Sequence, residues 1–248
     1  MRVGIQTCFL LLLLTTLSVA NSKADEAPPG VPRPQLEKDL ADVNERITEA
    51  PSPEHHIRAS LLFRLGRFKE AIADYDTAAR LGRPHDEYSC WERGLAQYYA
   101  GDFKNGGEQF ARYHRVGATD IENGLWYYLC VAEEEGVEKA RTKFFDYPQK
   151  LRKPFPALLA LYRGEGSAEA VLAEARLDTA SPEELKTRLF YAHYYLGKYF
   201  EIMDETEQAR THIRTSLEYE IPHFMYACAL LDAERLTPGT PKEKNDAS

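Results

Sequence analysis

Apolar residues recur at intervals of three and four along much of the chain, which is the spacing of one face of an α-helix. Leu36, Leu40, Val43 and Ile47 show this spacing near the start. No run of alternating β-branched residues of the kind that forms a strand interrupts the pattern. The pattern therefore predicts an all-α fold over residues 36–236.

A glycine between two helical segments recurs at a fixed spacing. Gly66, Gly101 and Gly136 are 35 residues apart (101 − 66 = 35 and 136 − 101 = 35). An aromatic residue follows each of them about nine residues later: Tyr75, Phe110 and Phe145. A fixed period of this size indicates a stack of helical hairpins, because one hairpin is too small to bury its own apolar face. We expect the three aromatic side chains to fill the space between successive hairpins.

Small residues occur within the first helix of three of these units, at Ala59, Gly94 and Gly197. A residue with little or no side chain allows the backbones of two helices to come close together. We therefore expect the first helix to pack tightly on its partner at these positions.

Two further units with weaker patterns follow nearer the C-terminus. The segment PALLALYRGEGSAEAVLAEA, from Pro156 to Ala175, is a degenerate unit around Gly164. The segment LGKYFEIMDETEQARTHIRTSLE carries Asp204 where the other units have their turn glycine. The segment PHFMYACALLDAERL, from Pro222, is expected to form a terminal helix that covers the last repeat.

These features resemble the tetratricopeptide repeat, a 34-residue helical hairpin with small and aromatic residues at set places. The first unit carries the resemblance best: Gly66, Phe68, Ala71, Tyr75 and Ala78 occupy the places of the family's turn Gly, Tyr, Ala, Phe or Tyr, and Ala. The resemblance implies a right-handed solenoid of about five hairpins plus a terminal capping helix. The hairpins are expected near residues 52–86, 87–121, 122–150, 151–180 and 190–223.

The order of the parts is similar to that of the NlpI lipoproteins of the bacterial envelope. The likeness runs from WYYLCVAEEEGVEKAR through FYAHYYLGKYFEIMDETEQAR to HFMYACALL. It implies an adaptor that docks envelope hydrolases or proteases. Lipid tethering does not carry over, because Cys8 precedes the apolar run of the N-terminus instead of following it.

The first twenty residues have the pattern of a cleavable signal peptide. Basic Met1-Arg2 precedes the apolar run from Phe9 to Leu14, and small residues place a cleavage site after Ala20 or, alternatively, after Ala24. The run is shorter than the ~20 residues that span a bilayer, which disfavours a membrane anchor. We expect an exported protein, periplasmic or secreted and soluble, with no membrane span in its mature form. Residues 21–35 read as a flexible Pro-rich lead-in and residues 237–248 as a disordered tail.

The charge of the chain disfavours nucleic acid and anionic membrane surfaces as partners. The formal net charge is −8, and removing residues 1–20 takes away one base and makes it −9 (30 − 39). Cys90, Cys130 and Cys228 remain in the mature chain. An odd number of cysteines leaves at least one thiol unpaired within the chain. Two readings stay open: three buried thiols that act as small apolar residues, or a disulfide between Cys90 and Cys130.

No pattern of residues predicts catalysis, a metal site or a cofactor. His55-His56 lacks the spacing of a metal motif, and Gly106-Gly107 is not followed by the Lys-Ser/Thr of a phosphate-binding loop. The acidic run from Glu133 to Glu135 precedes a turn glycine and reads as a solvated helix end. We therefore expect a protein that is not an enzyme and that needs neither cofactor nor metal.

The inner face implied by the resemblance is rich in aromatic residues. The residues expected to line this concave groove and bind a partner are His56, Phe63, Arg64, Tyr88, Trp91, Tyr98, Tyr99, Trp126, Tyr191 and Tyr194. Their rings and hydroxyls suit an extended peptide or a helix of a partner protein. An alternative is that several of them pack against a neighbouring helix. The clamp for a C-terminal carboxylate found in part of the family is absent, because Ser60, Glu92 and Tyr127 stand at its positions.

The sequence thus predicts a scaffold or adaptor that binds a protein or peptide in its aromatic groove. An alternative function is a binding protein for a small ligand or a cell-wall glycan, with the same rings stacking on sugars. Self-association through the groove or the terminal helices is a further possibility.

Overall fold

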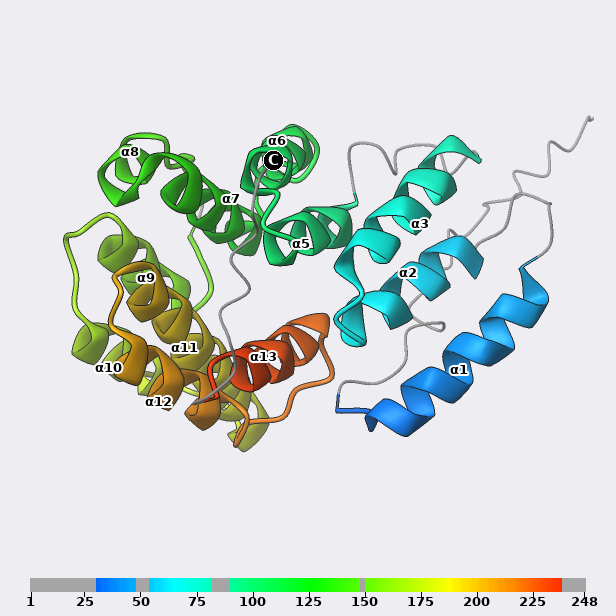
Figure 1. Cartoon of the computed structure of the whole chain (residues 1–248). Coiled ribbons are helices and arrows are strands. Elements are labelled where there is room, and N and C mark those ends of the chain that lie inside the picture. The colour runs from blue at the N-terminus through cyan, green and yellow to red at the C-terminus, as the bar shows by residue number, and fades with distance from the viewer. Residues whose placement is uncertain (1–29, 48–53, 82–89, 148–149, 238–248) are drawn as a thin grey trace, which may run out of the picture.

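The computed structural model describes residues 30–47, 54–81, 90–147 and 150–237. Over these ranges the chain is helical and contains no strand (Figure 1), as the apolar spacing predicts. The helices are α1 (Arg33–Arg46), α2 (Glu54–Arg64), α3 (Phe68–Arg80), α5 (Trp91–Tyr99), α6 (Phe103–His114), α7 (Ile121–Glu135), α8 (Val137–Thr142), α9 (Phe155–Tyr162), α10 (Ala168–Arg176), α11 (Pro182–Ile202), α12 (Thr206–Ser216) and α13 (Phe224–Arg235). The predicted signal peptide and nearly all of the predicted tail lie outside the described residues.

Consecutive helices of the described residues pack on one another, except that α8 and α9 share no such contact. The pairs α2/α3, α5/α6, α7/α8, α9/α10 and α11/α12 form five hairpins, and α1 packs on α2. Contacts between α3 and α5, between α6 and α7, and between α10 and α11 join hairpins to one another. In Figure 1 the hairpins follow an arc, and α13 lies on its inner side. Helix α1 begins at Arg33, inside the segment expected to be a flexible lead-in.

Four of the five hairpins turn in the same way. The turn residues Gly66, Gly101 and Gly164 have φ of +77°, +76° and +83°, and Asp204 takes the same place with φ of +61°. In each turn the amide after this residue donates to the carbonyl five residues earlier, as in a Schellman motif. These bonds are Arg67 to Leu62 (2.8 Å), Asp102 to Gln97 (2.9 Å), Glu165 to Ala160 (2.9 Å) and Glu205 to Phe200 (2.8 Å).

The packing inside two hairpins repeats at the same spacing. A Cβ atom on Gly94 would lie 2.8 Å from Cζ of Phe110, and one on Gly197 would lie 2.6 Å from Cδ1 of Ile213. Both pairs are 16 residues apart (110 − 94 and 213 − 197). Since real Cβ atoms almost never approach other heavy atoms so closely, the two helices of each hairpin need glycine here. This confirms the close approach predicted at these two glycines.

The third hairpin departs from the repeat. Its turn glycine, Gly136, has φ of +90° and ψ of 157°, and α8 ends after six residues at Thr142. Phe145 therefore lies beyond the helix, half-buried, with its ring stacked on His114 at 3.9 Å and on Tyr127 at 4.5 Å. His114 is on α6 and Tyr127 is on α7, so Phe145 does lie between the second and third hairpins, but it does so from the loop after α8 and not from within a helix. Tyr75 and Phe110, its equivalents in the first two hairpins, are buried as predicted.

Cys90, Cys130 and Cys228 are all buried, and no disulfide joins any two of them. Cys90 and Cys130 do not pair, so the reading of these residues as small core hydrophobes is the one the structure supports. Burial raises the pKa of the Cys130 and Cys228 thiols, which keeps them protonated and unreactive. Among the described helices, none is both long enough and apolar enough to cross a membrane.

The candidate site on the inner face and the helix that covers it

Most of the aromatic residues predicted to line a groove do gather in one place. They come from four helices: Phe63 on α2, Tyr98 and Tyr99 on α5, Trp126 on α7 and Tyr194 on α11. Ring centroids are 5.4 Å apart for Phe63 and Tyr99, and 5.2 Å apart for Tyr98 and Trp126. Trp126 and Tyr194 continue the contact at 6.4 Å. We call these five residues the aromatic stripe.

The aromatic stripe is not open to solvent. Phe63 and Tyr194 have no exposed surface, Trp126 is 2% exposed, and Tyr98 is also buried. Tyr99 is only half-buried, yet its hydroxyl is engaged inside the protein. Lys198 on α11 covers Tyr98 and Trp126, and α13 covers Phe63, Tyr99 and Tyr194. Helix α13 lies on the inner side of the arc and contacts both α12 and α2 (Figure 1). The C-terminal helix thus covers the inner face as well as the last hairpin.

The first residue of α13 inserts its ring between two elements of the inner face. The ring of Phe224 lies 5.0 Å from that of Phe63 and 5.3 Å, edge to face, from that of Trp91. The guanidinium carbon of Arg64 lies 5.2 Å from the centre of the same ring. Three predicted partner-binding residues, Phe63, Arg64 and Trp91, therefore contact a helix of their own chain.

Hydroxyls of the aromatic stripe bind a carboxylate on α13. The hydroxyl of Tyr99 donates to Oδ2 of Asp232 at 2.9 Å, and that of Tyr194 lies 3.3 Å from the same atom. The Tyr99 hydroxyl is also 3.3 Å from the carbonyl oxygen of Cys228. Burial raises the pKa of both tyrosines well above the ordinary value, so the phenols stay neutral and can donate.

Four charged residues complete the contact between α11 and α13. Nζ of Lys198 lies 2.8 Å from Glu201 and 3.3 Å from Asp232, while the guanidinium of Arg235 lies 2.5 Å from Glu201 and 2.8 Å from Asp232. The two positive and two negative charges balance. Burial by itself would raise the pKa of Glu201, but the attraction of Lys198 and Arg235 outweighs it and lowers that pKa.

The ammonium of Lys198 also faces the rings of the aromatic stripe. It is completely buried and lies 4.9 Å from the ring centre of Tyr98, 5.6 Å from Tyr99 and 5.8 Å from Trp126. Aromatic faces attract cations, and this attraction grows when water is excluded. The rings therefore stabilise a charge that would be costly to bury among aliphatic side chains.

Five residues of this site were not predicted. Phe224, Asp232 and Lys198 contact the aromatic stripe, and Glu201 and Arg235 form ion pairs with Lys198 and Asp232. One signal for them is present in the sequence. Phe224, Cys228, Asp232 and Arg235 follow one another at intervals of four, four and three, which places them on one face of a helix.

The other predicted groove residues lie elsewhere or cannot be placed. His56 contacts Tyr75, at 5.1 Å between rings, and its Nε2 lies 3.6 Å from Glu92. Tyr191 is buried away from the aromatic stripe, with its ring centre 4.5 Å from the guanidinium of Arg152. Tyr88 lies outside the described residues.

Around Tyr191 the structure forms a second polar cluster. Arg152 lies over the rings of Tyr191 and Phe155 and forms an ion pair with Glu122, whose other oxygen is 3.3 Å from the Tyr195 hydroxyl. Burial raises the pKa of Glu122 to about 7, although the positive charge of Arg152 acts in the opposite direction. This cluster links the start of α7, the loop before α9, and α11.

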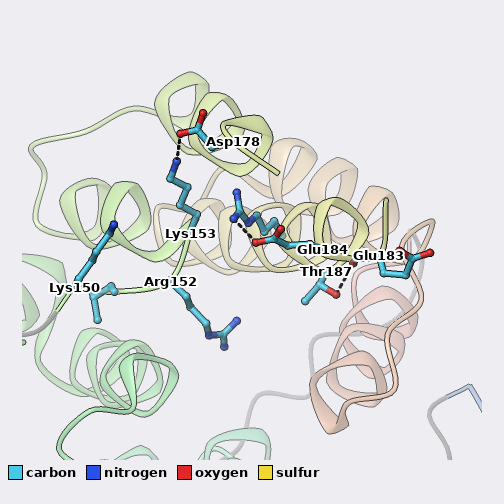
Figure 2. A pocket seen from close by; sticks show the side chains of 9 residues that line it. Lys150, Arg152, Lys153, Asp178, Glu183, Glu184 and Thr187 are labelled. Carbon is cyan, nitrogen blue, oxygen red and sulfur yellow. Dashed lines mark hydrogen bonds and ion pairs between the residues drawn. The ribbon is translucent and has the colours of Figure 1, made fainter. Parts of the chain in front are cut away.

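A pocket of about 580 Å³ opens beside this cluster, between the loop before α9 and the first turns of α11 (Figure 2). Its lining residues are Lys150, Leu151, Arg152, Lys153, Asp178, Glu183, Glu184, Thr187 and Arg188. Lys153 pairs with Asp178 at 3.1 Å, and Arg188 pairs with Glu184. Since opposite charges neutralise one another locally, the pocket does not concentrate charge of one sign.

Within the described ranges there is no group of three or more His, Cys, Asp or Glu side chains arranged to hold a metal ion. A search against protein-family models finds no match for this chain.

Proposed function

We propose that the protein is an exported, non-catalytic scaffold of the tetratricopeptide type, which binds a helical or peptide segment of a partner protein on its inner face. Envelope hydrolases or proteases are the partner class that the order of its parts suggests. The single observation that carries the proposal is the seating of α13 on that face. The aromatic stripe holds a helix through one aromatic ring and one carboxylate, which is the kind of contact a partner helix can reproduce.

Repetition inside the molecule supports the tetratricopeptide assignment. Four turns share a positive φ and the same hydrogen bond, and two hairpins share the contact between a first-helix glycine and a second-helix side chain. A stack of such hairpins creates an extended inner surface, which repeat proteins commonly use for binding. The apolar N-terminal run and the small residues after it support export.

The test is site-specific photo-cross-linking in envelope extract of the source organism. A photoreactive phenylalanine analogue replaces Trp91, which is half-buried at the edge of the inner face, or Val116, which is 64% exposed on the turn after α6. We expect an intermolecular adduct from position 91 that is absent from position 116. The adduct must form again with the purified partner. Equal adducts from both positions, or none from position 91, would refute binding at the inner face.

The alternative, a binding protein for a glycan or another small ligand, has less support. Sugar rings stack on exposed aromatic faces, whereas the aromatic stripe is covered by α13 and by Lys198. Thermal-shift measurements against muropeptides and oligosaccharides test it directly. A saturable rise in Tm at modest ligand concentration would favour this alternative over protein binding.

A further inference from the structure

The inner face contacts one side of α13. Phe224, Cys228, Asp232 and Arg235 all touch the aromatic stripe or the charged residues beside it. We propose that α13 is a displaceable occupant of the inner face, and that the partner replacing it is an amphipathic helix with the same stripe. The stripe consists of an aromatic residue, followed four residues later by a small residue, eight residues later by an acidic residue and eleven residues later by a basic residue. In α13 these are Phe224, Cys228, Asp232 and Arg235. This inference rests on the proposed function and specifies the chemistry of its partner.

The aromatic position is selected by the surroundings of Phe224. Its ring meets the rings of Phe63 and Trp91 and the guanidinium of Arg64, and it is 3% exposed. A ring fills this space and offers its face to the cation, which an aliphatic side chain cannot do. A partner helix without an aromatic residue here loses both contacts.

The small position is selected by a close approach of backbone and side chain. Cys228 has no exposed surface, and its carbonyl oxygen lies 3.3 Å from the hydroxyl of Tyr99. A longer side chain at this point of the helix would push the backbone away from Tyr99. A partner helix therefore needs Ala, Ser, Cys or Gly at this position.

The carboxylate position is selected by three donors that converge on Asp232. The hydroxyls of Tyr99 and Tyr194 and the ammonium of Lys198 all reach its two oxygens. A helix that lacks the acid removes the acceptor that these three donors share, and a buried donor that loses its acceptor is costly. Binding thus discriminates strongly between Asp and an apolar residue.

Release of α13 is made easier by how it is attached. It is a helix of twelve residues, joined to α12 through the segment 217–223. The hairpins are joined by contacts of α3 with α5, α6 with α7, α7 with α11 and α10 with α11, none of which involves α13. Its docking surface contains four charged residues, and water can solvate these when the helix leaves, which offsets part of the loss of their ion pairs. A tethered helix still acts at a high effective concentration and weakens an incoming partner accordingly.

The first test is native-state hydrogen exchange on the unaltered full chain. We expect amides in α13 to exchange through an opening of lower free energy than amides in the centre of α11, because α13 leaves while the hairpins stay folded. If α13 and α11 amides exchange through the same global unfolding, α13 is a permanent part of the core and the inference is wrong. This readout requires no variant and no partner.

The second test adds a fluorescent peptide of residues 222–237 to the full chain and follows its anisotropy. We expect the variant Phe224→Ala, checked by circular dichroism, to bind the peptide at least 10-fold tighter than the unaltered chain does. A peptide with Asp232→Asn should bind at least 10-fold more weakly. The matched control exchanges Phe224 with Leu230, which is exposed on α13, and so keeps the composition but loses the stripe.

Equal binding of the stripe and control peptides, or no binding to the Phe224→Ala variant, would contradict the inference. Both tests use only this chain, so their failure is separate from failure of the proposed function. If position 91 captures a partner while α13 never opens, the proposed function stands and the displacement does not. If α13 opens and position 91 captures no partner, the displacement of α13 stands and the proposed function does not.

Discussion

The hydroxyl of Tyr99 donates a 2.9 Å hydrogen bond to the carboxylate of Asp232, which is 133 residues away in the sequence. This bond joins the second hairpin to α13, the helix that lies on the inner side of the arc (Figure 1). Tyr99 was predicted from the sequence to bind a partner, whereas Asp232 was not predicted to take part in any site.

Removing the Tyr99 hydroxyl should destabilise the protein while keeping its ring in place. We expect Tyr99→Phe to lower the free energy of unfolding in urea by about 1.5–3 kcal/mol, because the acceptor is a buried charge. The matched control is Tyr127→Phe, since the Tyr127 ring stacks on Phe145 and its hydroxyl makes no hydrogen bond with the described residues. A loss as small as that of the control would show that the bond contributes little.

The buried pair of Lys198 and Asp232 should behave non-additively. Asp232→Leu alone is expected to cost about 3–5 kcal/mol, because it leaves the Lys198 ammonium buried with one fewer partner. In Lys198→Met/Asp232→Leu, Glu201 and Arg235 remain as a matched pair, so the double variant should recover at least about 1 kcal/mol over the single one. Urea denaturation of the full double-mutant cycle measures the coupling. Additive losses would mean that the two charges do not interact.

Two glycines on neighbouring helices should respond oppositely to alanine. A Cβ at Gly94 would meet the ring of Phe110 at 2.8 Å, whereas one at Gly107 would lie 3.5 Å from Cβ of Cys130, an ordinary contact. We expect Gly94→Ala to lower stability by about 1–3 kcal/mol through overpacking. Gly107→Ala should raise it by up to about 1 kcal/mol through helix propensity. Thermal and chemical denaturation of the two variants measure these changes in the free energy of unfolding. If both variants change stability in the same direction, the close packing of Gly94 on Phe110 is contradicted.

The turns of the first and last hairpins should respond oppositely as well. Gly66 has φ of +77° with nothing within 4 Å of an added Cβ, so Gly66→Ala tests the backbone alone. We expect it to cost about 1 kcal/mol. Asp204 has φ of +61°, and Asp204→Gly should stabilise by at most about 0.5–1 kcal/mol, since the greater freedom of glycine in the unfolded chain offsets part of the gain. Shifts in Tm measure both.

Acid should weaken the packing of α11 on α12 through a pair of histidines. Nδ1 of His193 lies 3.0 Å from Nδ1 of His212, and burial together with the charges of His212 and Arg176 lowers the pKa of His193 to about 4. Since this pKa is below that of the unfolded chain, ~6.5, the contribution to stability is complete above pH ~6.5 and is lost as the pH falls toward 4. Partial solvent screening should limit the loss to on the order of 1 kcal/mol.

The measurement for this pair is the free energy of unfolding from pH 7 to pH 4 for the unaltered protein and for His193→Gln. The difference between the two pH profiles gives the contribution of His193, because Glu122 is present in both proteins and its effect cancels. Burial raises the pKa of Glu122, so its protonation adds stability as the pH falls. Parallel pH profiles of the two proteins would contradict the role given to His193.

The hairpins were predictable because their signals are local. Gly66, Gly101 and Gly164 fix turns by their own backbone freedom, and Gly94 and Gly197 mark close packing by having no side chain. Asp204 was placed correctly because the helices on either side of it keep the spacing of the repeat. The early end of α8 was not predicted: Phe145 lies between two hairpins as expected, but on the loop after α8 and not within the helix. Nothing in the period itself signals that early end.

The aromatic residues of the inner face were predictable as a set, but their exposure was not. Apolar spacing and glycine turns act over a few residues, so the order of residues alone determines the helices, the hairpins and the faces on which Phe63, Tyr98, Tyr99 and Trp126 lie. Whether those faces meet water or another helix depends on how far the arc curves and on where α13 comes to rest. The curvature of the arc and the position of α13 both result from many weak contacts between segments that are far apart in the sequence. Only in the folded molecule do Tyr99, Lys198 and Asp232 meet, and there the C-terminal helix covers the surface that the sequence marked for a partner.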